Sequence, residues 1–206
     1  MDVLPLALTG GWASGISAYA TVLVIGLAGR AGLADVPDGL ERTDVLVVVG
    51  LLTAVEFLAD KIPWLDSAWD SVHTVIRPLV AAGLGALLAG EAETLTQAAT
   101  AALTAGVALL SHSAKAGLRL AVNTSPEPAS NVAVSATEDL SLVGVLLLAT
   151  QAPWLAAGIA MLLLAVGLGL AWWLLARVRR GWRRLWERLD PAPPAPPPPP
   201  VSPPDA

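Results

Sequence analysis

The sequence predicts an all-α membrane protein, a polytopic helical bundle of about six spans, from three observations. Of its 206 residues, 55% are hydrophobic and 14% are charged, whereas soluble domains carry about 25% charged residues. Long stretches, among them 3–29 and 140–176, contain no charged residue. Each of them exceeds the ~20 apolar residues that a spanning helix needs. Basic residues also concentrate in alternate connections, as the positive-inside rule describes for polytopic proteins.

Six apolar segments follow one another along the chain, and turn-forming or polar residues separate them. A loop with Pro37 and Gly39 follows the first segment, and an amphipathic stretch at 60–77 follows the second. Pro153 divides the last two segments, because proline favours the end of one helix and the start of the next. The six segments cover residues 11–29, 45–59, 78–90, 95–120, 140–152 and 154–176.

Two of these segments, 78–90 and 140–152, are short for a membrane span. Thirteen helical residues extend about 20 Å, less than the ~30 Å hydrocarbon core. Either flanking polar residues inside the bundle extend these helices, or the segments are re-entrant. Three segments in each half of the chain also suggest a 3+3 inverted repeat, as in many secondary transporters.

The basic residues predict the orientation. Six spans place both termini on one side, which then receives ten basic residues against two on the other. We therefore expect a multi-pass protein of the cell (inner or plasma) membrane with both termini in the cytoplasm. The first group comprises Lys61, Arg77, Lys115, Arg119 and six arginines at 177–188; the second comprises Arg30 and Arg42.

The C-terminal region divides into two parts beyond the transmembrane domain at 1–176. Residues 177–189 predict an amphipathic interfacial helix, because Trp182, Trp186 and Leu189 recur at helical spacing among arginines. Such a helix would lie on anionic lipids of the inner leaflet; the alternative is an extension of the last span that serves as a topology signal. Residues 190–206 predict a disordered proline-rich tail. Binding to a membrane surface explains the arginines at 177–188 better than binding to nucleic acid does.

Ionisable residues at membrane depth are costly and are functional candidates by default. Glu56 and Asp60 lie four residues apart and share one helical face. The same spacing rule groups an acidic stripe, a basic stripe and an acidic pair, and Asn123 opens a polar loop. Packing acidic against basic faces would neutralise both. The remaining candidates are Asp66, Asp70, His73, Arg77, His112, Lys115, Arg119, Glu138 and Asp139.

Three functions are weighed for these residues, beside a structural role in which paired charges lock helices together. In a transport or permeation protein, Glu56 and Asp60 form a proton or cation site. The basic stripe of His112, Lys115 and Arg119 then contacts an anionic group or supplies counter-ions. The second function is a membrane-embedded enzyme that uses a divalent metal to act on a lipid or lipid-linked phosphate. In a non-catalytic scaffold, the proline tail is the contact point.

The enzyme alternative places a divalent metal on Asp66, Asp70 and His73, which share one helical face. Their spacing is loose, and we expect neither a metal nor a cofactor. The absence of cysteine excludes disulfides and thiol catalysis. The sequence also lacks a Gly-x-Ser-x-Gly elbow, a phosphate-binding loop and a dinucleotide fingerprint.

Small residues crowd the first apolar segment between Gly10 and Ser17. They permit close contact between helices and also a kink or an unwound turn, which transporters use to direct backbone dipoles at a substrate. Small-residue faces are also compatible with a homo-oligomer.

Two long stretches resemble a known family. One is EFLADKIPWLDSAWDSVHTVIRP at 56–78, and the other is HSAKAGLRLAVNTSPEP at 112–128. Together with GISAYAT at 15–21 they resemble the bacterial membrane family called domain of unknown function 4126, over residues 8–175. The resemblance implies an integral membrane protein and supplies no activity, substrate or catalytic residue. Ser17 stands where asparagine is common in the family, which weakens any role for its side chain.

Overall fold

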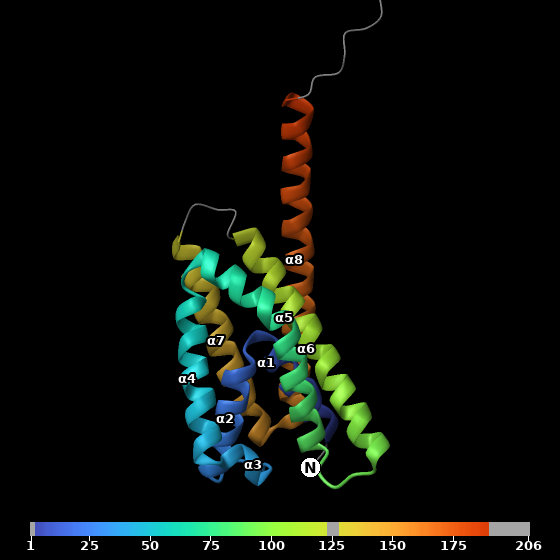
Figure 1. Cartoon of the computed structure of the whole chain (residues 1–206). Coiled ribbons are helices and arrows are strands. Elements are labelled where there is room, and N and C mark those ends of the chain that lie inside the picture. Colours follow the sequence, from blue (N-terminus) through green and yellow to red (C-terminus); the bar gives the residue numbers. More distant parts are fainter. Residues whose placement is uncertain (1–2, 123–127, 190–206) are drawn as a thin grey trace, which may run out of the picture.

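The computed structural model describes residues 3–122 and 128–189, and every regular element in these ranges is a helix (Figure 1). Asn123 and the proline-rich tail at 190–206 lie outside the described residues. The helices are α1 (Val3–Ile16), α2 (Ala18–Arg30), α3 (Asp38–Glu41), α4 (Thr43–Ala59), α5 (Pro63–Leu88), α6 (Thr94–Val122), α7 (Pro128–Gln151) and α8 (Pro153–Leu189).

Four of these helices, α5 to α8, are long and apolar enough to cross a membrane, and α1 and α2 are shorter apolar helices. The chain is therefore built as a multi-pass helical membrane protein. The short segments predicted at 78–90 and 140–152 belong to helices of 26 and 24 residues. Flanking polar residues therefore extend both segments into longer helices, as expected if they are not re-entrant. Pro78 lies inside α5 without ending it.

The first apolar segment does not form one spanning helix. Ser17 stands between α1 and α2 in an extended conformation (φ −149°, ψ 111°), and its side chain accepts a hydrogen bond from the Ala20 amide. In Figure 1, α1 rises from the N-terminal end to the middle of the bundle, and α2 returns to the end where α3 lies. The two helices form a re-entrant hairpin, with Ser17 at its tip. The expectation of one continuous helix at 11–29 is therefore wrong, and the count of six spans is not confirmed.

The re-entrant hairpin also determines where the described part of the chain begins. The start of α1 lies at the α3 end of the bundle, whereas α8 ends beyond the opposite end (Figure 1). The described ends of α1 and α8 thus differ from the expectation that both termini share one side, because the hairpin enters and returns instead of crossing; the orientation of the termini in a membrane stays a prediction. Residues 1–10 contain no Lys or Arg, so the segregation of the basic residues is unaffected. The 3+3 inverted repeat stays a prediction.

The small residues of α1 bring the hairpin into close contact with α6. A Cβ atom added to Gly11 would lie 2.7 Å from the carbonyl oxygen of Thr104. One added to Gly15 would collide with the backbone of Ala108. The Ser111 hydroxyl also donates to the Trp12 carbonyl oxygen at 2.7 Å. The small residues were expected to permit either close helix contact or a break in the helix. The structure shows both, close packing against α6 and the break at Ser17.

The Arg- and Trp-rich segment at 177–189 continues α8 without a break, and the helix projects beyond the bundle (Figure 1). Trp182 and Trp186 are exposed on it, and the guanidinium of Arg177 stacks over the Trp173 ring at 4.3 Å. The segment is thus structurally the end of the last span. Its position on anionic lipids stays a prediction.

Candidate functional site

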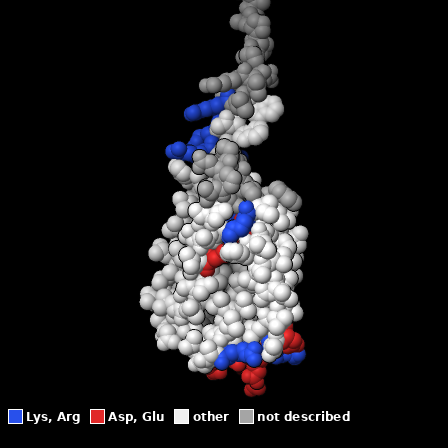
Figure 2. Space-filling view, turned by 90° about the vertical axis from the view of Figure 1, so that its left-hand side faces the viewer, with Lys and Arg blue, Asp and Glu red and all other residues white. Residues whose placement is uncertain are grey.

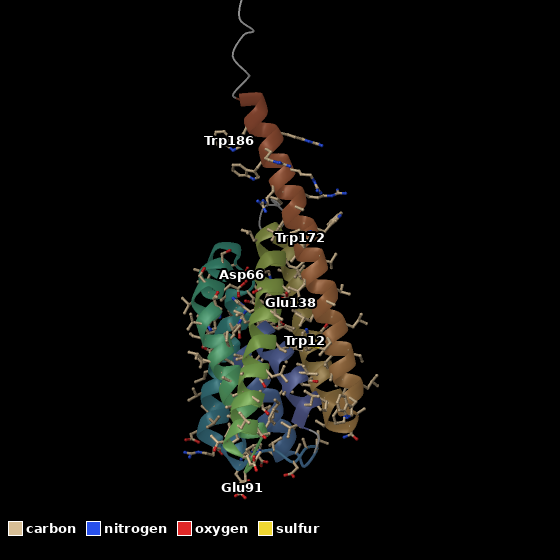
Figure 3. All side chains as sticks on the ribbon, turned by 90° about the vertical axis from the view of Figure 1, so that its right-hand side faces the viewer. Trp12, Asp66, Glu91, Glu138, Trp172 and Trp186 are labelled. Carbon is tan, nitrogen blue, oxygen red and sulfur yellow. The ribbon has the colours of Figure 1, made fainter. Side chains whose placement is uncertain are left out.

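The charged residues predicted at membrane depth come together beside the hairpin tip. Figure 3 shows Asp66 and Glu138 at similar heights, beyond Trp12 and far from Glu91 at the opposite end. Nine of the candidates are at most 5% exposed. Burial of this kind is tolerated only when charges are paired and hydrogen-bonded. The nine are Glu56, Asp60, Asp66, Asp70, His73, Arg77, His112, Lys115 and Arg119.

Arg119 of α6 joins three elements of the bundle. Its guanidinium lies 2.8 Å from Asp66 of α5 and 2.9 Å from Glu138 of α7. It also lies 3.3 Å from the Asp60 carboxylate and donates to the Asp60 backbone oxygen at 3.1 Å. Its planar group, with five donors, suits several carboxylates at once.

Lys115 lies one turn before Arg119 and connects the end of α4 to the hairpin. Its ammonium contacts the Asp60 carboxylate at 2.8 Å and the Ile16 carbonyl oxygen at 3.0 Å. Burial by itself raises the pKa of Asp60, but Lys115 and Arg119 outweigh it. The net result is a pKa below the ordinary value of the carboxyl group.

Arg77 of α5 forms the second centre of the cluster. It lies 2.6 Å from Glu56 and 3.1 Å from Asp70, and it donates to the Gly15 carbonyl oxygen at 3.2 Å. The second oxygen of Glu56 accepts a hydrogen bond from the Ser17 hydroxyl. Arg77 and Glu56 therefore both hold the hairpin tip.

The charges around the tip match the dipoles of its two helices. A helix carries partial negative charge at its C-terminus and partial positive charge at its N-terminus. The carbonyls at the end of α1 face the cations Arg77 and Lys115, and Ser17, at the start of α2, contacts the anion Glu56. These contacts were not predicted, because the departure from asparagine weakened the case for Ser17 and the sequence cannot reveal which backbone carbonyls are left open.

The hydrogen bonds of His112 define its protonation state. Arg77 can only donate, so the His112 Nδ1 atom, 2.5 Å from Arg77 Nη1, accepts. The Nε2 atom then carries the proton and donates to the Thr74 hydroxyl at 3.0 Å, while that hydroxyl donates to the Asp70 carbonyl oxygen. His112 is thus neutral and oriented toward a cation, an arrangement that does not suit an anion ligand.

The three residues of the metal alternative have separate partners. Asp66 pairs with Arg119 and Asp70 with Arg77. His73 donates from Nδ1 to the Trp69 carbonyl at 2.8 Å, and its Nε2 atom lies 3.1 Å from the Tyr19 hydroxyl. Within residues 3–122 and 128–189, no group of three His, Asp or Glu side chains is arranged to hold a metal ion.

Asp139 lies at the edge of the cluster and not within it. Its carboxylate is 35% exposed and lies 3.8 Å from the Lys61 ammonium. Lys61 also donates to the Ser135 hydroxyl at 2.6 Å and lies over the Phe57 ring at 3.8 Å. Figure 2 shows a side of the bundle nearly without charge apart from one small patch of both signs and the two ends.

A cavity of about 190 Å³ opens between α2, α4 and α7. We call it the acidic cavity, because Glu56, Asp60 and Asp139 line it together with the hydroxyls of Ser17 and Thr53. Apolar side chains form the remaining wall. The acidic pair predicted from its spacing therefore faces a space that can hold small polar species.

The model of the family described as "Domain of unknown function (DUF4126)" matches residues 4–176. The chain belongs to this family. The match confirms the resemblance, and it ends before the Arg- and Trp-rich end of α8. The curated proteins and the solved structures contain no significant match to this DUF4126 protein. The cluster and the hairpin tip both lie inside the matched region.

Proposed function

We propose that this DUF4126 protein is a transport or permeation protein for protons or small cations, which bind at Glu56 and Asp60. The observation that carries the proposal is the acidic cavity at the tip of a re-entrant hairpin. Discontinuous helices whose ends point at a site inside the bundle are a recurring feature of transporters. An ionisable side chain in this setting marks an ion or proton path.

The charge balance favours a cation over an anion. Among the described residues, the cluster and the Lys61–Asp139 pair contain six carboxylates and four basic side chains. With neutral histidines, the formal excess is two negative charges, which a bound cation or protons would compensate. The basic side chains are already held by carboxylates and carbonyls, so they act as counter-ions.

The other two hypotheses have less support. The enzyme would need a metal on Asp66, Asp70 and His73, whose side chains have the separate partners described above. The scaffold would act through the tail at 190–206, which lies outside the described residues. Transport is the hypothesis that uses the hairpin, the cavity and the charge excess together.

Substituting Glu56 by glutamine tests the proposal. In liposomes under a K⁺ diffusion potential, wild-type protein should carry H⁺, followed with an internal pH dye, or Na⁺ or K⁺, followed as tracers. We expect Glu56→Gln to reduce this flux to the rate of protein-free vesicles, because the amide retains a hydrogen-bond acceptor for Arg77 but loses the charge.

Glu91→Gln is the matched control, since Glu91 is exposed at the opposite end of the bundle and its variant should conduct like wild type. Helix content and gel-filtration elution show that each variant is folded. Unchanged flux in a folded Glu56→Gln variant would contradict the assignment, as would wild-type protein that conducts none of these ions.

A further inference from the structure

Besides the acidic cavity, a second cavity of about 180 Å³ lies toward the α3 end of the bundle. We call it the distal cavity. Thr9 of α1 lines it, as do Ala28 of α2 and Thr150 of α7, and Asp35 lies among its lining residues. The Thr9 hydroxyl is buried and has no hydrogen-bond partner in the described part of the chain. Water in the cavity would satisfy this hydroxyl.

The two cavities follow one another along the same pair of helices. On α2, Ala20 lines the acidic cavity and Ala28 the distal one. On α7, Leu142 lines the acidic cavity and Leu146 the distal one. Val24 lines both cavities. It packs against the apolar cluster that contains Leu142 and Leu146.

We propose that the two cavities are the halves of one permeation path, and that Val24, packed against the apolar cluster that contains Leu142 and Leu146, is its hydrophobic gate. The inference rests on the proposed function and adds the route and the barrier. An apolar constriction between two hydrated spaces stops ions because it excludes water. The path runs from the α3 end past Val24 to Glu56 and Asp60.

The location of the gate on α2 gives it a means of opening. α2 has 13 residues and is joined to α1 through the single extended residue Ser17. Glu56 contacts the Ser17 hydroxyl, so a cation or proton that reaches Glu56 competes for the contact that holds the tip. Occupancy of the acidic cavity and the position of Val24 are thus coupled through the seven residues that lead from Ser17 to Val24, about two turns of helix.

The absence of cysteine allows a test that does not depend on transport. Ala20→Cys places one thiol in the acidic cavity. Ag⁺, in chloride-free nitrate buffer, is applied to one side of sealed vesicles, and later maleimide labelling in detergent reports the thiols that remain free. With Val24 intact, we expect Ag⁺ to protect the thiol from the side of the α8 terminus and not from the α3 side. Adding Val24→Ser should allow protection from both sides.

The matched control is Val47→Ser, the same substitution at a residue of α4 that is 55% exposed; it should leave protection one-sided. Protection from both sides with Val24 intact would overturn the gate, and so would one-sided protection in the Val24→Ser protein. Flux separates the two proposals. Flux that depends on Glu56, with no effect of Val24→Ser on Ag⁺ access, refutes the gate alone. The expected Ag⁺ pattern without any ion flux refutes the proposed function alone.

Discussion

Replacing Arg119 by methionine is expected to lower the free energy of unfolding by about 3–5 kcal/mol, the cost of removing one partner from a buried ion pair. Arg119 contacts Asp60, Asp66 and Glu138. Methionine fills a similar volume but leaves these carboxylates facing one another without their shared cation. We therefore expect the end of α4 and the start of α5 to separate from α7, and little folded protein to accumulate.

Unfolding in mixed detergent micelles, with titrated denaturing detergent, measures the difference. Arg30→Met is the control, because Arg30 is exposed at the end of α2 and surface substitutions usually change stability by less than about 0.5 kcal/mol. Arg119→Lys should fall between the two, since it retains the charge and loses the planar fork. If Arg119→Met were as stable as Arg30→Met, the buried charge cluster would not hold the helices together.

The second large effect is expected at Gly15, where even one methyl group has no room. The Cβ atom of Gly15→Ala would meet the Ala108 carbonyl oxygen and the Ser111 side chain. Overpacking of a close contact costs about 1–3 kcal/mol. Here it also displaces the Gly15 carbonyl from Arg77. We expect the variant to lose both stability and ion flux.

Gly106→Ala on α6 is the matched control, because no atom lies within 4 Å of the position of its added Cβ. Alanine favours a helix over glycine by about 0.5–1 kcal/mol, so this variant should be as stable as wild type or slightly more stable. Both variants are compared by the same detergent titration and the same vesicle assay. Equal stability and equal flux in the two would show that the hairpin tip tolerates movement away from α6.

The sequence predicted most of the helices, because apolar length and helix-breaking residues are local signals. The segment at 95–120 is close to α6, and that at 45–59 is close to α4. Helical spacing also identified the faces that carry Arg77 and Arg119. It could not assign partners, which depend on how helices pack: Arg77 binds Glu56 and Asp70, whereas Arg119 takes Asp66.

The re-entrant hairpin could not be predicted from apolar length, because residues 3–29 would suit an ordinary span equally well. The chain reverses at one extended residue, Ser17, without a proline. Contacts from other helices stabilise this break: Arg77 and Lys115 bind carbonyls at the end of α1, and Glu56 accepts from Ser17. The nearest local signal is the run of small residues from Gly10, which also fits a straight, closely packed helix.

Labelling of single cysteines from each side of the membrane tests most directly whether the first apolar segment returns to the side from which it enters. Leu4 and Leu33 flank the hairpin and are each 49% exposed, and Arg180 lies on the projecting end of α8. In sealed vesicles, we predict that an impermeant maleimide labels Leu4→Cys and Leu33→Cys from the same side, and Arg180→Cys from the other. Labelling of Leu4→Cys and Arg180→Cys from one side, with Leu33→Cys on the opposite side, would contradict the re-entrant hairpin on which the proposed site depends.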